Sequence, residues 1–303
     1  MKLASVDIGS NAIRLQVIKV YEDNNLVSFK NLQLLRFPLR LGKDVFTHGE
    51  ITPGTQVRFI TLMSAFKHLI DLYEVQDYYA VATSAMREAS NGVVIQKQIN
   101  EEIGLKINII NGKKEALILN KAIRSTLSDK KYVHIDVGGG STEINLLEGN
   151  TLVKSKSFKI GSVRTLSGKE RTATFKTMGE WLEDTPFHRQ KNIVGIGTGG
   201  NINRLFKLAN KTHGSAISYA ELKALRAYVK EFSVDERMTI LKMNPDRADV
   251  IIPASEIYLR VLKEMGSDHI LVPRVGLKDG LVYELYEQTT KKNLNKIEYL
   301  GYL

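Results

Sequence analysis

A stretch in the middle of the chain combines two acids with a run of glycines, a pattern suited to binding phosphate. Residues 132–143 read Tyr-Val-His-Ile-Asp-Val-Gly-Gly-Gly-Ser-Thr-Glu, so an apolar, β-branched run ends in Asp136 and leads through a turn to Glu143. Glycines allow a sharp turn whose backbone N–H groups form a concave anion site. A carboxylate beside such a turn suits Mg²⁺, which prefers one or two carboxylates together with phosphate oxygens. A plain hairpin turn with two solvated acids is the competing interpretation.

The start of the chain carries a similar unit. Asp7 ends an apolar run, a turn of small residues follows, and a second apolar run begins at Ile13. Asp7 and Asp136 hold equivalent places 129 residues apart, a spacing too long for a solenoid repeat. We therefore expect two related domains that each present a strand–turn–strand phosphate loop. The candidate loop residues are Gly9, Ser10 and Asn11 in the first unit and Gly138, Gly139, Gly140 and Ser141 in the second.

Hydrophobic periodicity predicts a similar order of strands and helices in both halves, which indicates α/β domains over residues 1–125 and 126–303. The first half contains a predicted turn at Asp23-Asn24-Asn25, a loop over residues 38–51, and a helix that begins at Thr52-Pro53. In the second half we expect one helix over residues 247–265, irregular at Pro253, and a tail without strong pattern from residue 291. Strands are expected at 3–8, 13–20, 26–35, 78–82, 106–110, 132–137, 142–147, 151–158, 192–196 and 268–272, and further helices at 91–104, 113–126 and 276–288.

Three other features could contribute to a phosphate site. Arg87 lies on a predicted turn after a strand, where it could clamp phosphate oxygens or pair with Glu88 or Glu101. Glu115 opens a predicted helix, where a carboxylate most often only compensates the helix dipole. Residues 195–200 match G-x-G-x-x-G, but the acid found about 20 residues later belongs to a helix capping box. We therefore interpret these glycines as a third phosphate-facing loop, with the candidate residues Gly197, Thr198 and Gly199.

The composition is that of a soluble globular protein without disulfides. The 303 residues carry 43 basic and 33 acidic side chains, a net charge of +10, and no cysteine. The excess charge is spread over both halves, so no basic arm indicates a nucleic-acid partner, and diffuse charge suits small or linear polyanions. The chain contains no apolar run of about 18 residues, so no membrane span is predicted. Met1-Lys2 leads straight into a predicted strand, so no cleaved leader is expected. We expect a cytoplasmic protein without a membrane partner.

Five motifs occur in a characteristic order: Asp7–Asn11, Ala82–Asn91, Asp136–Glu143, Gly195–Gly200 and Arg247–Asp249. Together they resemble the exopolyphosphatase / guanosine pentaphosphate phosphohydrolase (Ppx/GppA) family, which belongs to the sugar kinase, heat-shock chaperone and actin superfamily. The resemblance covers nearly the whole chain. It implies two ribonuclease-H-like (actin-like ATPase) domains, each a mixed five-stranded sheet flanked by helices, with an active-site cleft between them. It also implies Mg²⁺-dependent removal of the terminal phosphate from inorganic polyphosphate or from guanosine pentaphosphate.

The resemblance also assigns roles to individual residues. Glu115 matches the catalytic glutamate, and Glu143 matches a second catalytic acid close to the metal. Asp136, Glu143 and Asp7 are the candidate ligands for Mg²⁺, while the glycine loops and Arg87 would hold phosphate groups. The chain departs from the family pattern at Lys113-Lys114, where further acid is usual. Nearby positive charge would lower the pKa of Glu115 and make it a weaker base.

We therefore predict a Mg²⁺-dependent exopolyphosphatase, because the distributed positive charge suits a long polyanion better than a single nucleotide. An ATP-dependent small-molecule kinase with the same fold is one alternative, although no acceptor-binding signature accompanies it. A non-catalytic sensor of polyphosphate or guanosine tetraphosphate is another, favoured by Lys113-Lys114 beside the base. The sequence leaves open the preferred substrate, the chain length, the processivity and whether the chain forms a homodimer.

Overall fold

The chain folds into two compact units, which are described separately. The computed structural model describes residues 1–23, 26–164, 166–188, 190, 192–212, 214–294 and 298–302, the last five through their backbone only. Unit 1 comprises residues 1–125 and 276–303, and unit 2 comprises residues 126–275. The predicted turn residues Asn24 and Asn25 lie outside the described residues.

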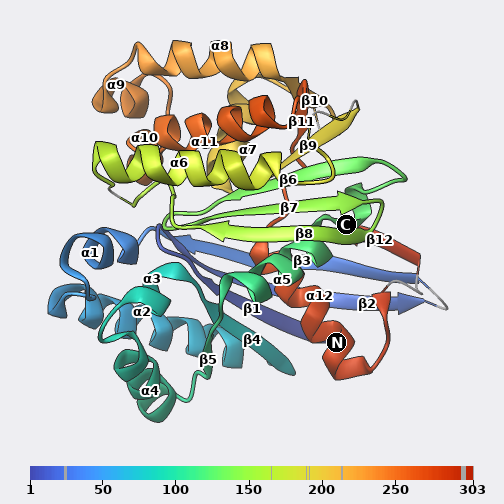
Figure 1. Cartoon of the computed structure of the whole chain (residues 1–303). Coiled ribbons are helices and arrows are strands. Elements are labelled where there is room, and N and C mark those ends of the chain that lie inside the picture. Colours follow the sequence, from blue (N-terminus) through green and yellow to red (C-terminus); the bar gives the residue numbers. More distant parts are fainter. Residues whose placement is uncertain are drawn as a thin grey trace. The chain divides into compact units, whose positions relative to one another are not determined.

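Unit 1 is built on a six-stranded sheet in the order β12-β3-β2-β1-β4-β5 (Figure 1). The first three strands form an antiparallel meander, and β4 and β5 extend the sheet in parallel from β1. The strands are β1 (Lys2–Ile8), β2 (Ile13–Asp23), β3 (Leu26–Phe37), β4 (Asp77–Ala82), β5 (Ile107–Ile109) and β12 (Glu298–Tyr302). The helices are α1 (Leu41–His48), α2 (Pro53–Leu72), α3 (Ser84–Glu88), α4 (Gly92–Ile103), α5 (Gly112–Ile123) and α12 (Leu277–Thr290), and a 3₁₀ turn (Arg124–Thr126) leads into unit 2.

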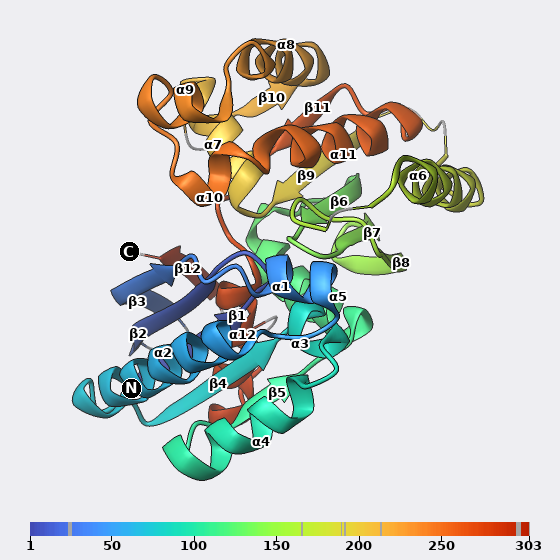
Figure 2. The same cartoon turned by 90° about the vertical axis from the view of Figure 1, so that its left-hand side faces the viewer.

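Helices cover both faces of this sheet, which explains why its central strands are apolar on both sides. Alternate residues of β1, including Ala4 and Val6, pack into a core with α1 to α4. The residues between them belong to the other face, where Leu3 joins a cluster with Tyr283 and Tyr286 of α12. Figure 2 shows α2 and α12 on opposite faces of the sheet. Because side chains alternate between the faces, Asp7 points to the same side as Leu3.

Unit 2 repeats this arrangement. Its sheet has the order β10-β11-β9-β6-β7-β8, with an antiparallel meander from β6 to β8 and parallel strands β9 and β11 beyond β6. The strands are β6 (Lys131–Val137), β7 (Thr142–Glu148), β8 (Thr151–Phe158), β9 (Ile193–Thr198), β10 (Ala216–Ser218) and β11 (His269–Leu271). The helices are α6 (Gly168–Glu183), α7 (Gly200–Leu208), α8 (Tyr219–Lys230), α9 (Val234–Thr239), α10 (Pro245–Ala248) and α11 (Ile251–Glu264).

The two sheets share a five-strand order, which is the mixed-sheet, helix-flanked architecture expected from the sequence. A meander of three strands is followed by two parallel strands in each unit, and one further edge strand, β12 or β10, completes each sheet. In unit 2, Val133, Ile135 and Val137 of β6 pack with the helices, whereas His134 and Asp136 belong to the opposite face. One side of this sheet is therefore apolar and the other carries polar side chains.

The last helix belongs to the first unit, contrary to the predicted second domain of residues 126–303. The chain divides after Ser125, where the sequence places the boundary, but residues 276–303 return to unit 1. There α12 packs against α5, β1 and β4, and β12 pairs with β3. The second unit is therefore residues 126–275, and the tail contains a strand that the sequence pattern does not predict.

Three local expectations also differ from the structure. Residues 38–51 contain the helix α1, which is only 8 residues long and therefore gives a weak periodic signal. The predicted helix over 247–265 is two helices, α10 and α11, and the break falls before Ile251. Pro253 lies in the first turn of α11, where an N–H would have no intrahelical partner, so it causes no irregularity there.

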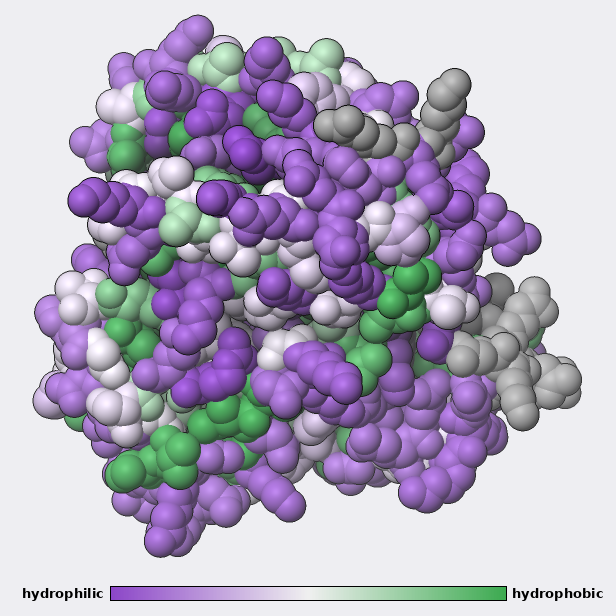
Figure 3. All heavy atoms as spheres, viewed as in Figure 1, coloured by the Kyte–Doolittle hydropathy of each residue, from purple (hydrophilic) through white to green (hydrophobic). Residues whose placement is uncertain are grey.

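Hydrophilic side chains cover most of the face of the molecule shown in Figure 3. Large apolar side chains are also exposed, among them Leu72, Val93 and Val94. Among the described residues, no helix is both long enough and apolar enough to cross a membrane.

Candidate functional site

The two glycine turns predicted from the sequence have the same hydrogen-bonded geometry. The N–H of Gly9 donates to the carbonyl of Ala12 at 3.2 Å, and the N–H of Gly138 donates to the carbonyl of Ser141 at 3.0 Å. A Cβ added to Gly9 or Gly138 would lie 3.1 Å from the oxygen that accepts this bond, so glycine suits both positions. Each turn joins the first two strands of its sheet. The structure thus reproduces the internal repeat at the level of individual bonds.

In unit 2 a second loop holds the carbonyl groups of the glycine turn. Ser162 donates from its N–H to the carbonyl of Gly138 at 2.9 Å, and Val163 donates to that of Gly139 at 2.8 Å. The Nε of Arg164 donates to the carbonyl of Gly140 at 2.6 Å. Within the described part of the chain, the N–H groups of Gly139 and Gly140 have no acceptor. A turn with fixed carbonyls and available N–H groups can bind an anion.

The two acids of unit 2 are cross-strand neighbours at the end of β6 and the start of β7. Asp136 lies directly opposite Glu143 in the antiparallel register, so both side chains project from the same face of the sheet. Glu143 is 1 % exposed, and its Oε1 accepts a hydrogen bond from the Ser157 hydroxyl at 2.8 Å. Ser157 is in turn the register partner of Glu143 on β8. The acids and Ser157 therefore form one polar row across three strands.

This donor set suits a hard cation that keeps other oxygen ligands. Among the described residues, no group of three or more His, Asp and Glu side chains could hold a metal ion. Asp136 and Glu143 supply two carboxylates, which matches the one or two that Mg²⁺ takes from a protein before water and phosphate complete its octahedron. The chemistry of the donors therefore fits Mg²⁺ and does not fit a site made wholly from protein ligands.

Asp136 also receives a hydrogen bond from the neighbouring parallel strand. The hydroxyl of Thr198, its register partner on β9, donates to Asp136 Oδ1. The carbonyl of Thr198 accepts from the hydroxyl of Tyr258, whose pKa is raised well above its ordinary value by burial and by the nearby charge of Asp136. The Thr198 hydroxyl is thus a donor to Asp136, and phosphate binding by Thr198 stays a prediction.

A fully buried histidine lies on the same face, two residues before Asp136. His134 contacts the Thr198 hydroxyl through Nε2 at 2.9 Å and the Asn145 amide nitrogen through Nδ1 at 3.1 Å. Burial lowers the pKa of His134 to about 3. Neither His134 nor Asn145 is among the candidate residues predicted from the sequence. The available signal was the polar spacing i, i+2 on strands that are otherwise apolar, namely His134 with Asp136 and Glu143 with Asn145.

The glycines of the third predicted loop have different roles. At Gly197, an added Cβ would lie 2.8 Å from Ile270 Cδ1 and 3.0 Å from Ile202 Cγ1, so this glycine lets β9 pack against its neighbours. Gly199 has φ of +99°, a left-handed conformation that favours glycine. A Cβ there would lie 3.6 Å from Asp136 Oδ1. Gly199 therefore borders the acid pair, and Gly197 allows close packing; phosphate binding by Gly197 stays a prediction.

In unit 1 the position equivalent to Glu143 is occupied by a cation. Asp7 lies opposite Arg14 in the register of β1 and β2, as Asp136 lies opposite Glu143 in unit 2. The Arg14 guanidinium donates to Asp7 Oδ2 at 2.7 Å, and the Asp7 carboxylate is buried. Beside it, the hydroxyls of Ser10 and Ser84 are 2.8 Å apart. Asp7 is therefore already paired with a positive charge inside its own unit.

Glu115 lies in the first turn of α5 and is buried, with 6 % of its surface exposed. Arg87 of α3 reaches this turn, since its Nη1 donates to the carbonyl of Ile110 at 2.7 Å and lies 3.9 Å from Glu115 Oε2. The partner of Arg87 is therefore Glu115, and neither Glu88 nor Glu101 takes the role proposed from the sequence. Asn111 caps the helix by accepting from the N–H of Lys114 at 2.9 Å.

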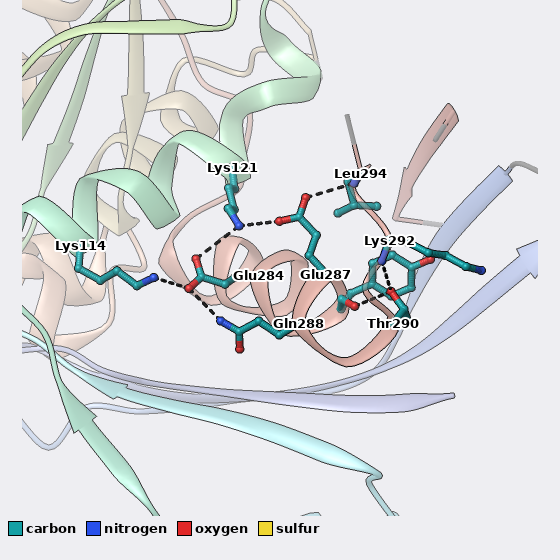
Figure 4. Close-up of polar contacts among 9 residues, drawn as sticks. Lys114, Lys121, Glu284, Glu287, Gln288, Thr290, Lys292 and Leu294 are labelled. Carbon is teal, nitrogen blue, oxygen red and sulfur yellow. Dashed lines mark hydrogen bonds and ion pairs between the residues drawn. The ribbon is translucent and has the colours of Figure 1, made fainter. Parts of the chain in front are cut away.

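Lys114, directly before Glu115, is paired with a different acid. Lys114 Nζ donates to Glu284 of α12, and Lys121 lies 3.5 Å from the other oxygen of Glu284 and 2.6 Å from Glu287 (Figure 4). Glu284 is buried and also accepts from Gln288 at 3.3 Å. The positive charge of Lys114 is thus balanced by an acid that lies far from it in the sequence.

Comparison with known proteins gives the family of the chain. A model of the Ppx/GppA phosphatase family matches residues 19–289. The chain belongs to this family. Among curated relatives, the chain is 28 % identical to a bifunctional 3-dehydroquinate synthase/phosphatase of Fusobacterium nucleatum, covering 93 % of this chain and 46 % of that protein. It is 23 % identical to a guanosine-5'-triphosphate,3'-diphosphate pyrophosphatase of Aliivibrio fischeri, covering 94 % of this chain and 59 % of the relative.

Solved structures of the Ppx/GppA family share the fold. The Aquifex aeolicus PPX-GPPA enzyme is 27 % identical, with a TM-score of 0.74 over 93 % of this chain and 98 % of that one. An exopolyphosphatase from Cytophaga hutchinsonii has a TM-score of 0.82 at 22 % identity, over 95 % of this chain and 98 % of that one. The chain spans about half the length of the curated relatives that it matches. The expected ribonuclease-H-like, actin-like domains are therefore confirmed.

Proposed function

We propose that this Ppx/GppA protein is a Mg²⁺-dependent exopolyphosphatase that removes the terminal phosphate of inorganic polyphosphate, with guanosine pentaphosphate as a second candidate substrate. The observation that carries the proposal is the Asp136–Glu143 pair beside a glycine turn with available N–H groups. The names of the relatives support the reaction class, since they include an exopolyphosphatase and a guanosine pentaphosphate pyrophosphatase. A cytoplasmic location belongs to the same proposal, because the chain has no cysteine.

In this proposal Asp136 and Glu143 hold Mg²⁺, and Asp7 remains a third candidate ligand. When bound, the ion would polarise the terminal phosphate and offset its charge. The N–H groups of Gly139 and Gly140 would donate to phosphate oxygens and stabilise the charge that develops there. Ser10 and Asn11 of the unit 1 turn, Ser141, and Gly199 beside Asp136 remain further candidates for phosphate contacts.

Glu115 is the proposed base that orients and deprotonates the attacking water. Arg87 supports this role because it contacts both the carbonyl of Ile110 and the Glu115 carboxylate, which fixes the side chain in place. The sensor alternative depended on Lys113-Lys114 weakening this base. Since Lys114 is paired with Glu284, that argument is weakened for Lys114.

Release of phosphate in the presence of Mg²⁺ tests the proposal. The wild type, Glu115→Gln and Glu101→Gln are compared on long-chain polyphosphate and, separately, on guanosine pentaphosphate. Glu101 is a matched control because it is an exposed acid of the same unit, paired with Lys97 in a surface i,i+4 contact. We expect release from polyphosphate that falls by at least about 100-fold in Glu115→Gln and is unchanged in Glu101→Gln.

Each other outcome selects an alternative. Binding of polyphosphate without release would favour the sensor. Release from ATP only when a small hydroxyl compound is present would favour the kinase. Unchanged release in Glu115→Gln would retain the hydrolase and reject Glu115 as its base.

A further inference from the structure

The polar face of the unit 2 sheet carries a second row of side chains behind the acid row. Asn145 is the register partner of His134 on one side and of Ser155 on the other. The Ser155 hydroxyl lies 2.7 Å from Asn145 Oδ1, and the Asn145 amide nitrogen lies 3.1 Å from His134 Nδ1. His134 Nε2 lies 2.9 Å from the Thr198 hydroxyl, which in turn bonds to Asp136. The row therefore ends on a proposed metal ligand.

Asn145, with its amide nitrogen toward His134 and its amide oxygen toward Ser155, gives this row a single direction. The Asn145 amide nitrogen can only donate, so His134 Nδ1 must accept, and His134 is neutral with its proton on Nε2. That Nε2–H then donates to the Thr198 oxygen. The Thr198 hydroxyl accepts this bond and donates its own O–H to Asp136, because a carboxylate oxygen can only accept. At the far end, Asn145 Oδ1 accepts from Ser155.

Such an arrangement has a cost that an apolar strand would avoid. His134 and Asn145 are both completely buried, and buried polar groups destabilise a protein unless their hydrogen bonds are satisfied. The residues beside them on the same strands, Val133, Ile135, Ile144 and Leu146, are aliphatic. An aliphatic residue at position 134 would satisfy the packing of the sheet, but it would leave the Thr198 hydroxyl without the donor that orients it.

We propose that His134 is a positioning residue, which fixes the Thr198 hydroxyl as a donor to Asp136 and so holds the Asp136 carboxylate ready to bind a divalent cation. This inference rests on the proposed function for its effect on hydrolysis. Its structural part, the direction of the hydrogen bonds, stands independently of the reaction. Groups that hold metal ligands commonly change metal affinity or activity by about 10- to 100-fold when removed.

The first test is the tautomer of His134 in the whole protein. Long-range ¹H–¹⁵N NMR correlations at neutral pH distinguish a protonated Nε2 from a protonated Nδ1. The expected result is a proton on Nε2 and none on Nδ1. A proton on Nδ1 would reverse the direction of the row and overturn the proposal whatever the protein catalyses.

The second test separates positioning from packing. His134→Leu removes the donor to Thr198, whereas His134→Gln can place an amide N–H near the position of Nε2. Ile135→Val is the matched control, because Ile135 is equally buried on the same strand but faces the helices. The readouts are Mn²⁺ binding by calorimetry to the protein alone, and kcat and KM for phosphate release.

His134→Leu should weaken Mn²⁺ binding and lower kcat by about 10- to 100-fold, with KM for polyphosphate nearly unchanged. His134→Gln should recover most of both losses, and Ile135→Val should match the wild type.

Wild-type Mn²⁺ affinity and kcat in His134→Leu would show that the row is merely structural. If His134→Leu does not fold, the single variants His134→Gln and Asn145→Leu are measured in its place. Wild-type Mn²⁺ affinity and kcat in Asn145→Leu would then reject the positioning role of His134. Absence of phosphate release from the wild type would reject the proposed function, while Mn²⁺ binding and the tautomer would still decide this inference.

Discussion

At the scale of single residues, glycine has separable roles in this chain. Gly138 and Gly9 close equivalent turns, Gly199 has a left-handed backbone, and Gly197 allows close packing. Gly161 has yet another role, because a Cβ on it would lie 2.6 Å from the carbonyl carbon of Gly139 and 2.7 Å from the N of Gly140. The loop that holds the glycine turn can approach it only because residue 161 lacks a side chain.

Gly161→Ala should therefore damage the glycine turn. The added methyl group would contact backbone atoms that cannot rotate away, so we expect a loss of about 1–3 kcal/mol in the free energy of unfolding. Phosphate release should fall with it if the turn binds phosphate. Urea denaturation gives the stability. Gly179→Ala is the control, since Gly179 is inside α6 with open space around its Cβ position, and it should stabilise the protein by up to about 1 kcal/mol. Equal stability of Gly161→Ala and the wild type would contradict the assigned contact.

At the scale of elements, α5 is joined to α12 by a compact set of charges. Glu284 lies between Lys114 and Lys121 (Figure 4). Gly280 allows α12 to approach α5 closely, because a Cβ there would lie 2.8 Å from Ile118 Cγ2. Since α5 also carries Glu115, these contacts determine where the proposed base lies within unit 1.

Removing the Glu284 charge should loosen this junction. Glu284→Gln leaves two lysines without their buried partner, and because Lys114 is partly exposed we expect a loss of only about 1–2 kcal/mol. The coupling of Glu284→Gln with Lys121→Met in a double-mutant cycle measures the interaction. Glu180→Gln, which removes an exposed acid paired with Lys176, should change stability by less than about 0.5 kcal/mol. No coupling in the cycle would show that the Lys121–Glu284 contact contributes nothing to this junction.

A second junction, between α1 and α2, should give a pH-dependent stability. Burial raises the pKa of Asp44, but hydrogen bonds from Thr52 and Thr55 outweigh it, and the pKa lies below its ordinary value of 3.8. A carboxyl group whose pKa is lowered by folding stabilises the fold at any pH above its ordinary pKa. This stabilisation disappears as the pH falls through the folded-state pKa. Asp44→Asn should therefore cost about 1 kcal/mol at pH 7, and the difference should shrink below pH 3.8. Urea denaturation at several pH values measures this difference in the free energy of unfolding, with Asp71→Asn at an exposed position as the control. A difference between Asp44→Asn and the wild type that stays constant with pH would contradict the lowered pKa of Asp44.

At the scale of the whole molecule, the C-terminal segment completes the first unit rather than the second. Tyr283 and Tyr286 of α12 pack on Phe29 of β3, with ring centroids 5.2 and 5.6 Å apart. Leu3 and Val20 belong to the same cluster. Without α12, one apolar face of the first sheet would be open to water, and burying that face is what makes such a sheet stable.

A chain of residues 126–275 should therefore fold alone, whereas residues 1–125 should not. We expect cooperative urea unfolding of residues 126–275 and dye binding to exposed apolar surface in residues 1–125. Supplying residues 276–303 through a flexible linker should restore cooperative unfolding to the first unit. Cooperative folding of residues 1–125 alone would show that α12 adds little to the core.

The sequence by itself determined the features that depend on neighbouring residues. Glycine turns, strand alternation and the capping box at Ser218 follow from local backbone and side-chain preferences, so the repeated unit around Asp7 and Asp136 and the α/β class were predictable. The register of each meander then follows from its short turn, which places Glu143 opposite Asp136.

Only the tertiary structure decided which distant segments meet. The return of α12 to unit 1, the balance of Lys114 by Glu284 and the bond from Thr198 to Asp136 join residues far apart in the chain. Many arrangements satisfy the local preferences of these segments equally well. The choice among them depends on burying apolar faces and satisfying buried polar groups over the whole domain, and no short stretch of sequence contains that information.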